Sequence, residues 1–212
     1  METGSLARAL LVASVLLGFG MGGEARAQTL SPDLVSNLQK GGYVLVMRHT
    51  SSPTALPDKT SAAPGNDRLE RQLDATGQET ARAMGAAIKG LRIPIGDVLS
   101  SPTYRARETV RFAALPTPKT VDELGDGGQG MTVQAPAVMA TWLRTKSTEA
   151  PRAGTNTLVV THAPNITGAF AERANGIADG ETMVFKPDGK GGSTLVTRVK
   201  IDDWPRVVPL SQ

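Results

Sequence analysis

The sequence contains no cysteine. Disulfide bonds and thiolate metal sites are therefore excluded, and packing alone must hold the fold together. Aromatic residues make up only 4% of the chain, so the core must consist mainly of Val, Leu, Ile, Ala and Met. The 212 residues suffice for one domain of ordinary size or slightly more.

An excess of charge of one sign is also missing. The net charge is only +3, from 23 Lys and Arg against 20 Asp and Glu. Proteins that bind nucleic acids usually carry a dense basic stripe, which this composition does not suggest. We therefore expect no nucleic-acid partner, and the mild positive bias is compatible with an anionic small molecule or glycan.

The longest apolar run is short. Residues 9–19 are apolar, Arg8 precedes them, and Ala25-Arg26-Ala27 resembles a cleavage site. A transmembrane helix needs about 20 apolar residues, so the pattern favours a secretory signal peptide over an uncleaved anchor. We predict a signal peptide over residues 1–27 and one domain over residues 28–212, which would be soluble and periplasmic or secreted.

Two familiar catalytic motifs are absent. The sequence contains neither an HExxH zinc motif nor the GxSxG turn of serine hydrolases. It has only two histidines, His49 and His162, and they are far apart in the sequence. A metal site is therefore not expected. Both histidines lie where an apolar strand pattern gives way to a loop, a position where α/β proteins bind ligands.

Apolar strand patterns alternate with helical patterns along most of the chain. Alternation of this kind predicts an α/β fold, a three-layer α/β/α sandwich with a mostly parallel central sheet. Right-handed crossovers would bring the polar ends of the strands to one edge. The expected strands are 43–47, 97–100, 119–121 and 157–160, with a closing hairpin of 182–186 and 194–200. The expected helices are 32–39, 75–91, 102–113 with Ser101 as its cap, 133–147 and 165–174, with a turn at 93–96 and a long loop at 51–70.

Arginines accompany the polar strand ends. Arg48 precedes His49, and Arg105 lies in the first turns after Ser100-Ser101-Pro102. The planar guanidinium presents pairs of donors that match phosphate oxygens. We expect Arg48 and Arg105 to bind an anion, and we expect Arg107 and Arg111 to lie on a solvated helix face.

Three blocks of sequence, taken in order, resemble the histidine phosphatase superfamily, which includes the cofactor-dependent phosphoglycerate mutases. The block VLVMRHT stands where that family has a strand ending in Arg-His-Gly. In SSPTYRARETV, Arg105 and Thr109 are in register with the second block, and LVVTHAPNI supplies His162. The segment LDATGQETA, at the start of a predicted helix, also resembles a segment of the family. The closing hairpin resembles that of small periplasmic members. The resemblance implies a phosphoglycerate mutase-like fold.

The resemblance also implies a function, the hydrolysis of phosphomonoesters through a phosphohistidine. His49 would attack phosphorus, while Arg48, Arg105 and His162 would bind the equatorial oxygens. No metal and no cofactor would be needed. Neighbouring cations would keep the attacking imidazole neutral.

The chain departs from the family pattern at two places. Thr50 replaces the usual glycine, which could restrict the approach of the backbone to phosphate. The general acid is uncertain between Asp126, Glu123 and none. Asn165 is a candidate substrate contact or a helix cap. A phosphate-binding or phosphoglycan-binding protein with little catalysis and a mutase-type phosphotransferase remain as alternatives, and the sequence gives no oligomeric state.

Overall fold

The fold is organised around a mixed β-sheet. A computed structural model describes residues 1, 30–53, 70–126 and 134–206 of the chain. Within these residues six strands pair in the order β3-β2-β4-β1-β5-β6. Strands β1 to β4 are mutually parallel, β5 is antiparallel to β1, and β6 is antiparallel to β5. The strands are β1 Val44–Arg48, β2 Ile95–Ser100, β3 Lys119–Thr120, β4 Asn156–Thr161, β5 Thr182–Pro187 and β6 Ser193–Val199.

Helices connect the parallel strands. The α-helices of the described residues are α1 Pro32–Lys40, α2 Ala75–Gly90, α3 Tyr104–Phe112, α4 Pro136–Thr148 and α5 Ala163–Phe170. Three short 3-10 helices are η1 Asp122–Leu124, η2 Ala171–Ala174 and η3 Ile201–Asp203. No helix in this described part of the chain is both long enough and apolar enough to cross a bilayer.

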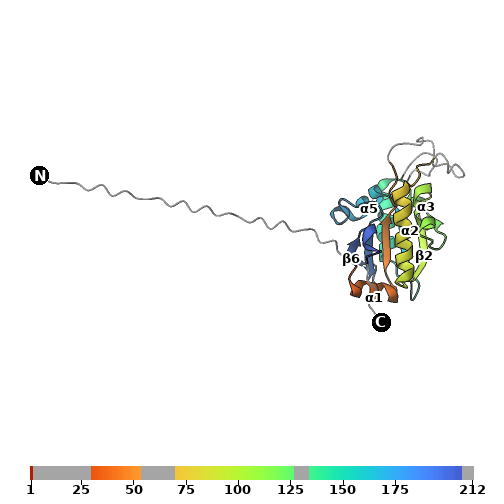
Figure 1. Cartoon of the computed structure of the whole chain (residues 1–212), viewed down its shortest axis with the longest axis horizontal. Helices are drawn as coiled ribbons and strands as arrows, with labels where there is room; N and C mark the ends of the chain where they lie inside the picture. The colour runs from red at the N-terminus through yellow and green to blue at the C-terminus, as the bar shows by residue number, and fades with distance from the viewer. Residues whose placement is uncertain (2–29, 54–69, 127–133, 207–212) are drawn as a thin grey trace.

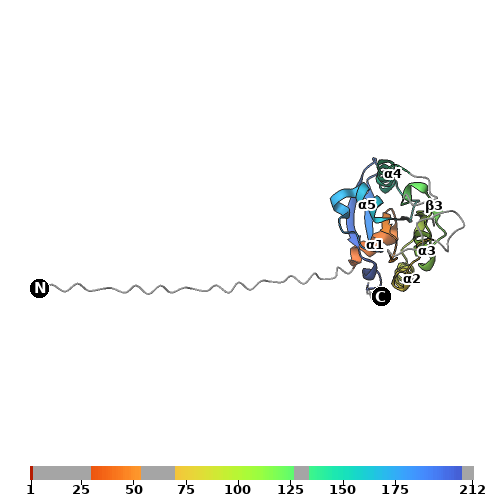
Figure 2. The ribbon, with the colours of Figure 1, turned by 90° about the horizontal axis from the view of Figure 1, so that it is seen from above.

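The helices cover both faces of the sheet, as Figures 1 and 2 show, with α2 and α3 on one side and α4 and α5 on the other. The alternation of side chains along β1 explains these layers. Leu45 and Met47 belong to the core that includes Met84 of α2. Val44 and Val46 belong to the core that includes α4 and α5. The predicted three-layer fold, mostly parallel with a closing hairpin, is confirmed.

Helix α2 contains two glycines that allow close contact with neighbouring backbone. A Cβ on Gly77 would lie 2.1 Å from the carbonyl oxygen of Ser51, and one on Gly85 would lie 1.9 Å from that of Ala113. The α2 N-cap, Asp74, accepts a hydrogen bond from the Gly77 N–H at 2.7 Å. The low helix propensity of glycine is therefore offset by packing that a side chain would prevent.

Two local predictions are wrong. Ile95 and Gly96 do not form a turn but open β2, where a bulge lies between Ile95 and Asp97. Ser101 is not the cap of α3, which begins at Tyr104 with Thr103 in the cap position. In both cases a tertiary contact overrides the local signal, and the Ser101 hydroxyl is directed to a histidine instead.

The remaining differences concern element ends. Helix α5 begins two residues before the predicted start, and a 3-10 turn replaces its predicted last residues 171–174. The predicted signal peptide lies almost entirely outside the described residues, and so does most of the predicted loop 51–70.

Candidate active site

The carboxyl ends of β2, β4 and β1 lie side by side. The His49 N–H donates to the Thr161 carbonyl at 2.9 Å, and the Ser101 N–H donates to the Val160 carbonyl at 2.9 Å. This places both histidines at the same edge of the sheet, with ring centroids 5.2 Å apart. Each histidine is only 3% exposed. The sequence-based expectation that these strand ends converge is therefore confirmed.

Arg105 joins the two histidines. Its Nε donates to His49 Nε2 at 3.2 Å, and its Nη2 donates to His162 Nδ1 at 3.1 Å. The same Nη2 forms an ion pair with Asp126. Arg105 reaches these partners from the first turn of α3 and is buried. The fork geometry of one guanidinium thus fixes the relative position of two imidazoles and a carboxylate.

The hydrogen bonds assign the tautomer of each histidine. Because arginine can only donate, His49 Nε2 must be an acceptor, and its Nδ1–H donates to the Thr50 carbonyl at 2.8 Å. By the same argument His162 accepts through Nδ1, and its Nε2–H donates to Ser101 Oγ at 2.9 Å. The lone pair of His49 that is available for chemistry is therefore on Nε2.

The electrostatic surroundings keep both rings neutral. Burial, then the charges of Arg105, Arg71 and Arg48, lower the pKa of His49 to about 3. Burial and the same arginines also hold the pKa of His162 well below its ordinary value. A neutral imidazole is the nucleophilic form, so His49 carries an available lone pair even in moderately acidic solution.

The side chain of Thr50 is hydrogen-bonded to Thr109 of α3. The Thr109 hydroxyl donates to the Arg105 carbonyl at 2.9 Å, so it accepts both from the Thr50 N–H and from the Thr50 hydroxyl, each at 3.1 Å. Among non-glycine residues in the described segments, positive φ angles occur at three positions, and Thr50 is not one of them. A glycine is therefore not required at position 50.

Arg48, which ends β1, has partners of its own. Its Nη2 forms an ion pair with Asp179 Oδ1 at 2.7 Å, and its Nη1 donates to the Ile177 carbonyl at 2.8 Å. Its Nε is buried and has no hydrogen-bond acceptor among the described residues. Arg48 therefore keeps one donor uncommitted, next to His49 in the chain.

Arg71 is a site residue that sequence reasoning missed. Its Nε donates to Ser52 Oγ at 3.0 Å. Burial and Arg105 lower the pKa of Arg71, and Asp126 and Asp179 oppose them. Arg71 therefore lies within electrostatic range of both Arg–Asp pairs. It follows a segment without periodicity, so nothing in its local sequence marked it.

Asn165 contacts the segment that carries Asp126. Its side-chain amide donates to the Gly125 carbonyl at 2.5 Å and to Thr161 Oγ1 at 2.9 Å. The Thr161 hydroxyl in turn donates to the Leu124 carbonyl at 2.7 Å. Asn165 does not cap α5, because the residue in the N-cap position is His162. In this structure Asn165 positions residues 124–126.

The structure also distinguishes among the other candidate residues. Asp126 contacts Arg105, whereas Glu123 lies in the 3-10 helix η1 with no contact to the histidines among the described residues. Arg111 is exposed and pairs with Glu108 of its own helix, and Arg107 Nε donates to the Pro102 carbonyl. Arg111 makes no contact to either histidine within the described structure.

A metal-binding cluster of three or more His, Cys, Asp or Glu side chains is not found among the described residues.

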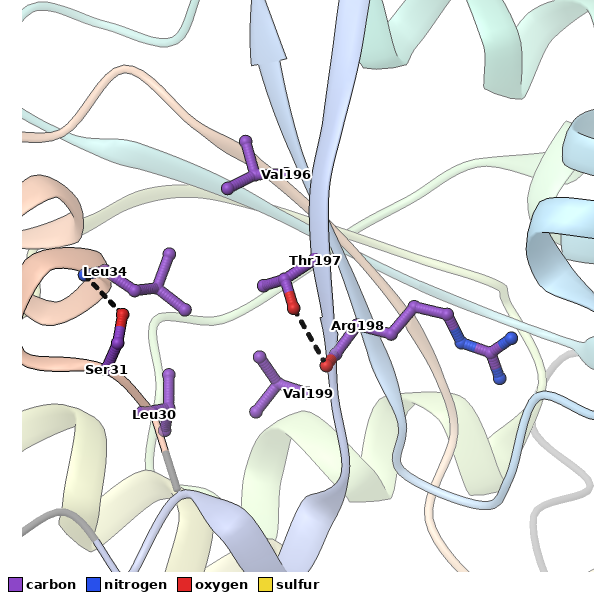
Figure 3. Close-up of a pocket in the computed structure, with 7 residues that line it drawn as sticks. All are labelled: Leu30, Ser31, Leu34, Val196, Thr197, Arg198 and Val199. Atoms are coloured by element: carbon purple, nitrogen blue, oxygen red, sulfur yellow. Dashed lines mark hydrogen bonds between the residues drawn. The ribbon is translucent and has the colours of Figure 1, made fainter. Parts of the chain in front are cut away.

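A separate pocket of about 350 Å³ lies between the start of α1 and the edge strand β6. Figure 3 shows that Leu30, Leu34 and Val199 border the pocket, and that the Arg198 side chain points away from them on the other side of the strand. This pocket is largely apolar and offers no nucleophile comparable to His49.

Comparison with known proteins agrees with this geometry. Residues 44–126 match the family model of the histidine phosphatase superfamily (branch 1). No curated protein matches the chain. The protein histidine phosphatase SixA, solved with tungstate, is a similar structure, with a TM-score of 0.53 and 21% identity over 76% of this chain and 98% of that one. A mutant phosphoserine phosphatase from Entamoeba histolytica, solved with phosphoserine, gives a TM-score of 0.52 and 12% identity over 76% and 98%.

Proposed function

We propose that this chain, whose residues 44–126 match the model of the histidine phosphatase superfamily, hydrolyses phosphomonoesters with His49 as the nucleophile. The observation that carries this proposal is the orientation of His49. Its Nδ1–H is held by the Thr50 carbonyl, and its Nε2 lone pair meets Arg105. An imidazole held in this way directs one lone pair toward a site that contains anion-binding groups.

In the proposed first step, His49 Nε2 forms a bond to phosphorus as the ester P–O bond breaks. The imidazole becomes positively charged, and the Thr50 carbonyl stabilises that charge by accepting the Nδ1–H. Asp126, released from its ion pair with Arg105 and protonated, gives its proton to the leaving oxygen. In the second step water attacks phosphorus, Asp126 takes the proton of the water, and inorganic phosphate leaves with neutral His49 restored.

The phosphoryl oxygens would bind to Arg48, Arg105 and His162. The Nε of Arg48 is already an unused donor. Arg105 would release both Asp126 and the His49 Nε2 lone pair as the phosphoryl group enters, and would donate to the phosphoryl oxygens instead. His162 would then donate to an oxygen through Nδ1 while Ser101 donates to Nε2. The Ser101 hydroxyl lies 2.9 Å from that nitrogen and can act in either direction.

A second candidate function is phosphate binding with little turnover. The supporting observation is that Arg105 holds the carboxylate of Asp126 in an ion pair. An acid that stays paired would not protonate the leaving group. A protein of this kind would bind vanadate or phosphate tightly without hydrolysing any member of a phosphoester panel.

The test of the proposed function is the steady-state hydrolysis of para-nitrophenyl phosphate and a panel of alkyl phosphates. His49→Asn retains a polar side chain and removes the nucleophile, so kcat is expected to fall at least about 10³-fold. Arg111→Gln, an exposed change on the helix that carries Arg105, is the matched control and should retain activity. Unchanged hydrolysis in His49→Asn would contradict the mechanism.

We also propose that the chain is exported and that the mature protein begins at Gln28. The support is the charged, apolar and small-residue pattern of residues 1–27. The amino-terminal sequence of the protein purified from a bacterial host tests this proposal. An intact Met1 on a membrane-bound product would contradict it.

A further inference from the structure

The segment 175–181, between η2 and β5, lies beside the proposed nucleophile. The Gly180 N–H donates to the His49 carbonyl at 3.0 Å, and the Arg48 N–H donates to the Glu181 carbonyl at 3.1 Å. These bonds tie the segment to the backbone of both Arg48 and His49. Asp179, which immediately precedes Gly180, is therefore held at the edge of the site.

The segment is itself firmly built. Arg198 binds Glu181 through two parallel contacts of 2.7 and 2.8 Å, and the Ala178 N–H donates to the same carboxylate at 2.8 Å. Burial alone would raise the pKa of Glu181, but Arg198 and the Ala178 N–H hold it below its ordinary value. The position of Asp179 is thus set by a buried ion pair and by backbone hydrogen bonds.

Asp179 engages Arg48 through a single oxygen. The Arg48 Nη2–Asp179 Oδ1 distance is 2.7 Å, yet Oδ1 has no well-directed hydrogen bond within the described structure. Oδ1 itself is buried, but the side chains of Arg48 and Asp179 as a whole are 27% and 38% exposed, so solvent reaches other parts of the ion pair. Ion pairs that are partly exposed and not ideally oriented are weak. The contact can therefore be displaced.

A carboxylate and a phosphoryl group use the same donors of a guanidinium. The site holds two Arg–Asp pairs, Arg48 with Asp179 and Arg105 with Asp126. Asp126 has a role in the proposed reaction as the proton donor, but Asp179 has none. A phosphomonoester dianion that approaches Arg48 must displace Asp179 or lie beside its negative charge, and either outcome weakens binding.

We propose that Asp179 competes with the phosphoryl group for Arg48 and so weakens the binding of phosphate. This inference rests on the proposed function, because it takes Arg48 as a phosphoryl ligand. The same competition favours release of inorganic phosphate after hydrolysis. It leaves the chemical step itself to His49 and Asp126.

The test is calorimetric titration of inorganic phosphate into the full chain, which needs no turnover. Asp179→Asn keeps the shape of the side chain and removes its charge, so phosphate should bind about three- to tenfold tighter. Asp179→Ser removes the same charge with a smaller side chain and should give the same shift. Asp97→Asn is the matched control, since Asp97 also pairs with an arginine, Arg152 at 3.2 Å, but lies away from the site. It should leave the affinity unchanged.

Unchanged phosphate affinity in a folded Asp179→Asn protein would overturn the proposal. Weaker affinity would also overturn it, because Asp179 would then orient Arg48 for binding. Tighter binding in this variant, with no phosphoester hydrolysed by the wild type, would contradict the proposed function alone. Failure of phosphate to bind to either protein would contradict both.

Discussion

Arg105 is a single side chain on which three others depend. It donates to His49 Nε2 and His162 Nδ1 through separate nitrogens and pairs with Asp126. A lysine has the same charge but presents it as a compact point, without the planar fork. The arrangement therefore depends on the shape of the guanidinium as well as on its charge.

Arg105→Lys is expected to lower kcat/KM about 10²- to 10³-fold, because the ammonium cannot meet both rings and the transferring phosphoryl oxygens together. Steady-state hydrolysis of para-nitrophenyl phosphate measures the effect. The exposed Arg111→Lys, on the same helix, is the control. Near wild-type activity in Arg105→Lys would show that positive charge alone is sufficient.

Asp126→Asn is expected to act through the leaving group. If Asp126 donates the proton, its loss should reduce kcat about 10²-fold for alkyl phosphates and much less for para-nitrophenyl phosphate, whose leaving oxygen needs little protonation. The measurement is the dependence of kcat on leaving-group pKa, with Glu123→Gln as the control. Equal losses for both classes of ester would argue against an acid role.

Some site residues could be predicted from sequence, and others could not, for a physical reason. Arg48, His49 and His162 lie at or directly after strand ends, where local pattern indicates ligand binding, and Arg105 lies in the first turn of the helix that follows β2. Arg71 and Asp179 reach the site only through tertiary contacts with distant segments. The spacing of residues along the sequence does not predict contacts between segments that are distant in the chain.

At the scale of elements, β4 and α5 determine where residues 124–126 lie. Thr161 ends β4 and Asn165 lies in the first turn of α5, and together they bind the carbonyls of Leu124 and Gly125. Because the adjacent His162 belongs to the site, one strand end positions both a histidine and the backbone next to Asp126.

Asn165→Ala should therefore affect both stability and catalysis. It leaves the buried Gly125 carbonyl without its side-chain donor, which should cost about 1–2 kcal/mol of unfolding free energy. It should also reduce alkyl phosphate hydrolysis selectively, as Asp126→Asn does. In the double variant the catalytic losses should not add. Additive losses would show that Asn165 acts independently of Asp126.

The elements themselves were largely predictable, because the alternation of apolar strands with amphipathic helices indicates one α/β architecture. The exact beginnings of β2 and α3 were not. Gly96 lies in β2 beside Thr155, whose hydroxyl oxygen would be 2.3 Å from a Cβ, so the residue there must lack a side chain. Ser101 binds His162 rather than capping α3. Both deviations come from packing against β4 and the segment before it.

At the scale of the whole molecule, the fold buries two neutral histidines near several arginines. The pKa of His49 is lowered to about 3, and that of His162 is lowered well below 6.5. Between these values and 6.5, the unfolded chain binds protons that the folded chain does not. Acidification within this window therefore favours unfolding.

The free energy of unfolding should fall by about 1.4 kcal/mol between pH 7.5 and 5.5 through His49, and should fall further through His162. Urea titrations at these two pH values measure the change. In His49→Gln the decrease should be smaller by about 1.4 kcal/mol. The same decrease in wild type and variant would show that His49 titrates normally in the folded protein.

The central claim is that His49 accepts the phosphoryl group. The most direct measurement is intact-protein mass spectrometry after a rapid acid-free quench with para-nitrophenyl phosphate, comparing the wild type with His49→Ala. The account predicts a phosphoryl adduct on the wild type alone. Absence of both an adduct and released nitrophenol from the folded wild type would contradict it and favour the phosphate-binding alternative.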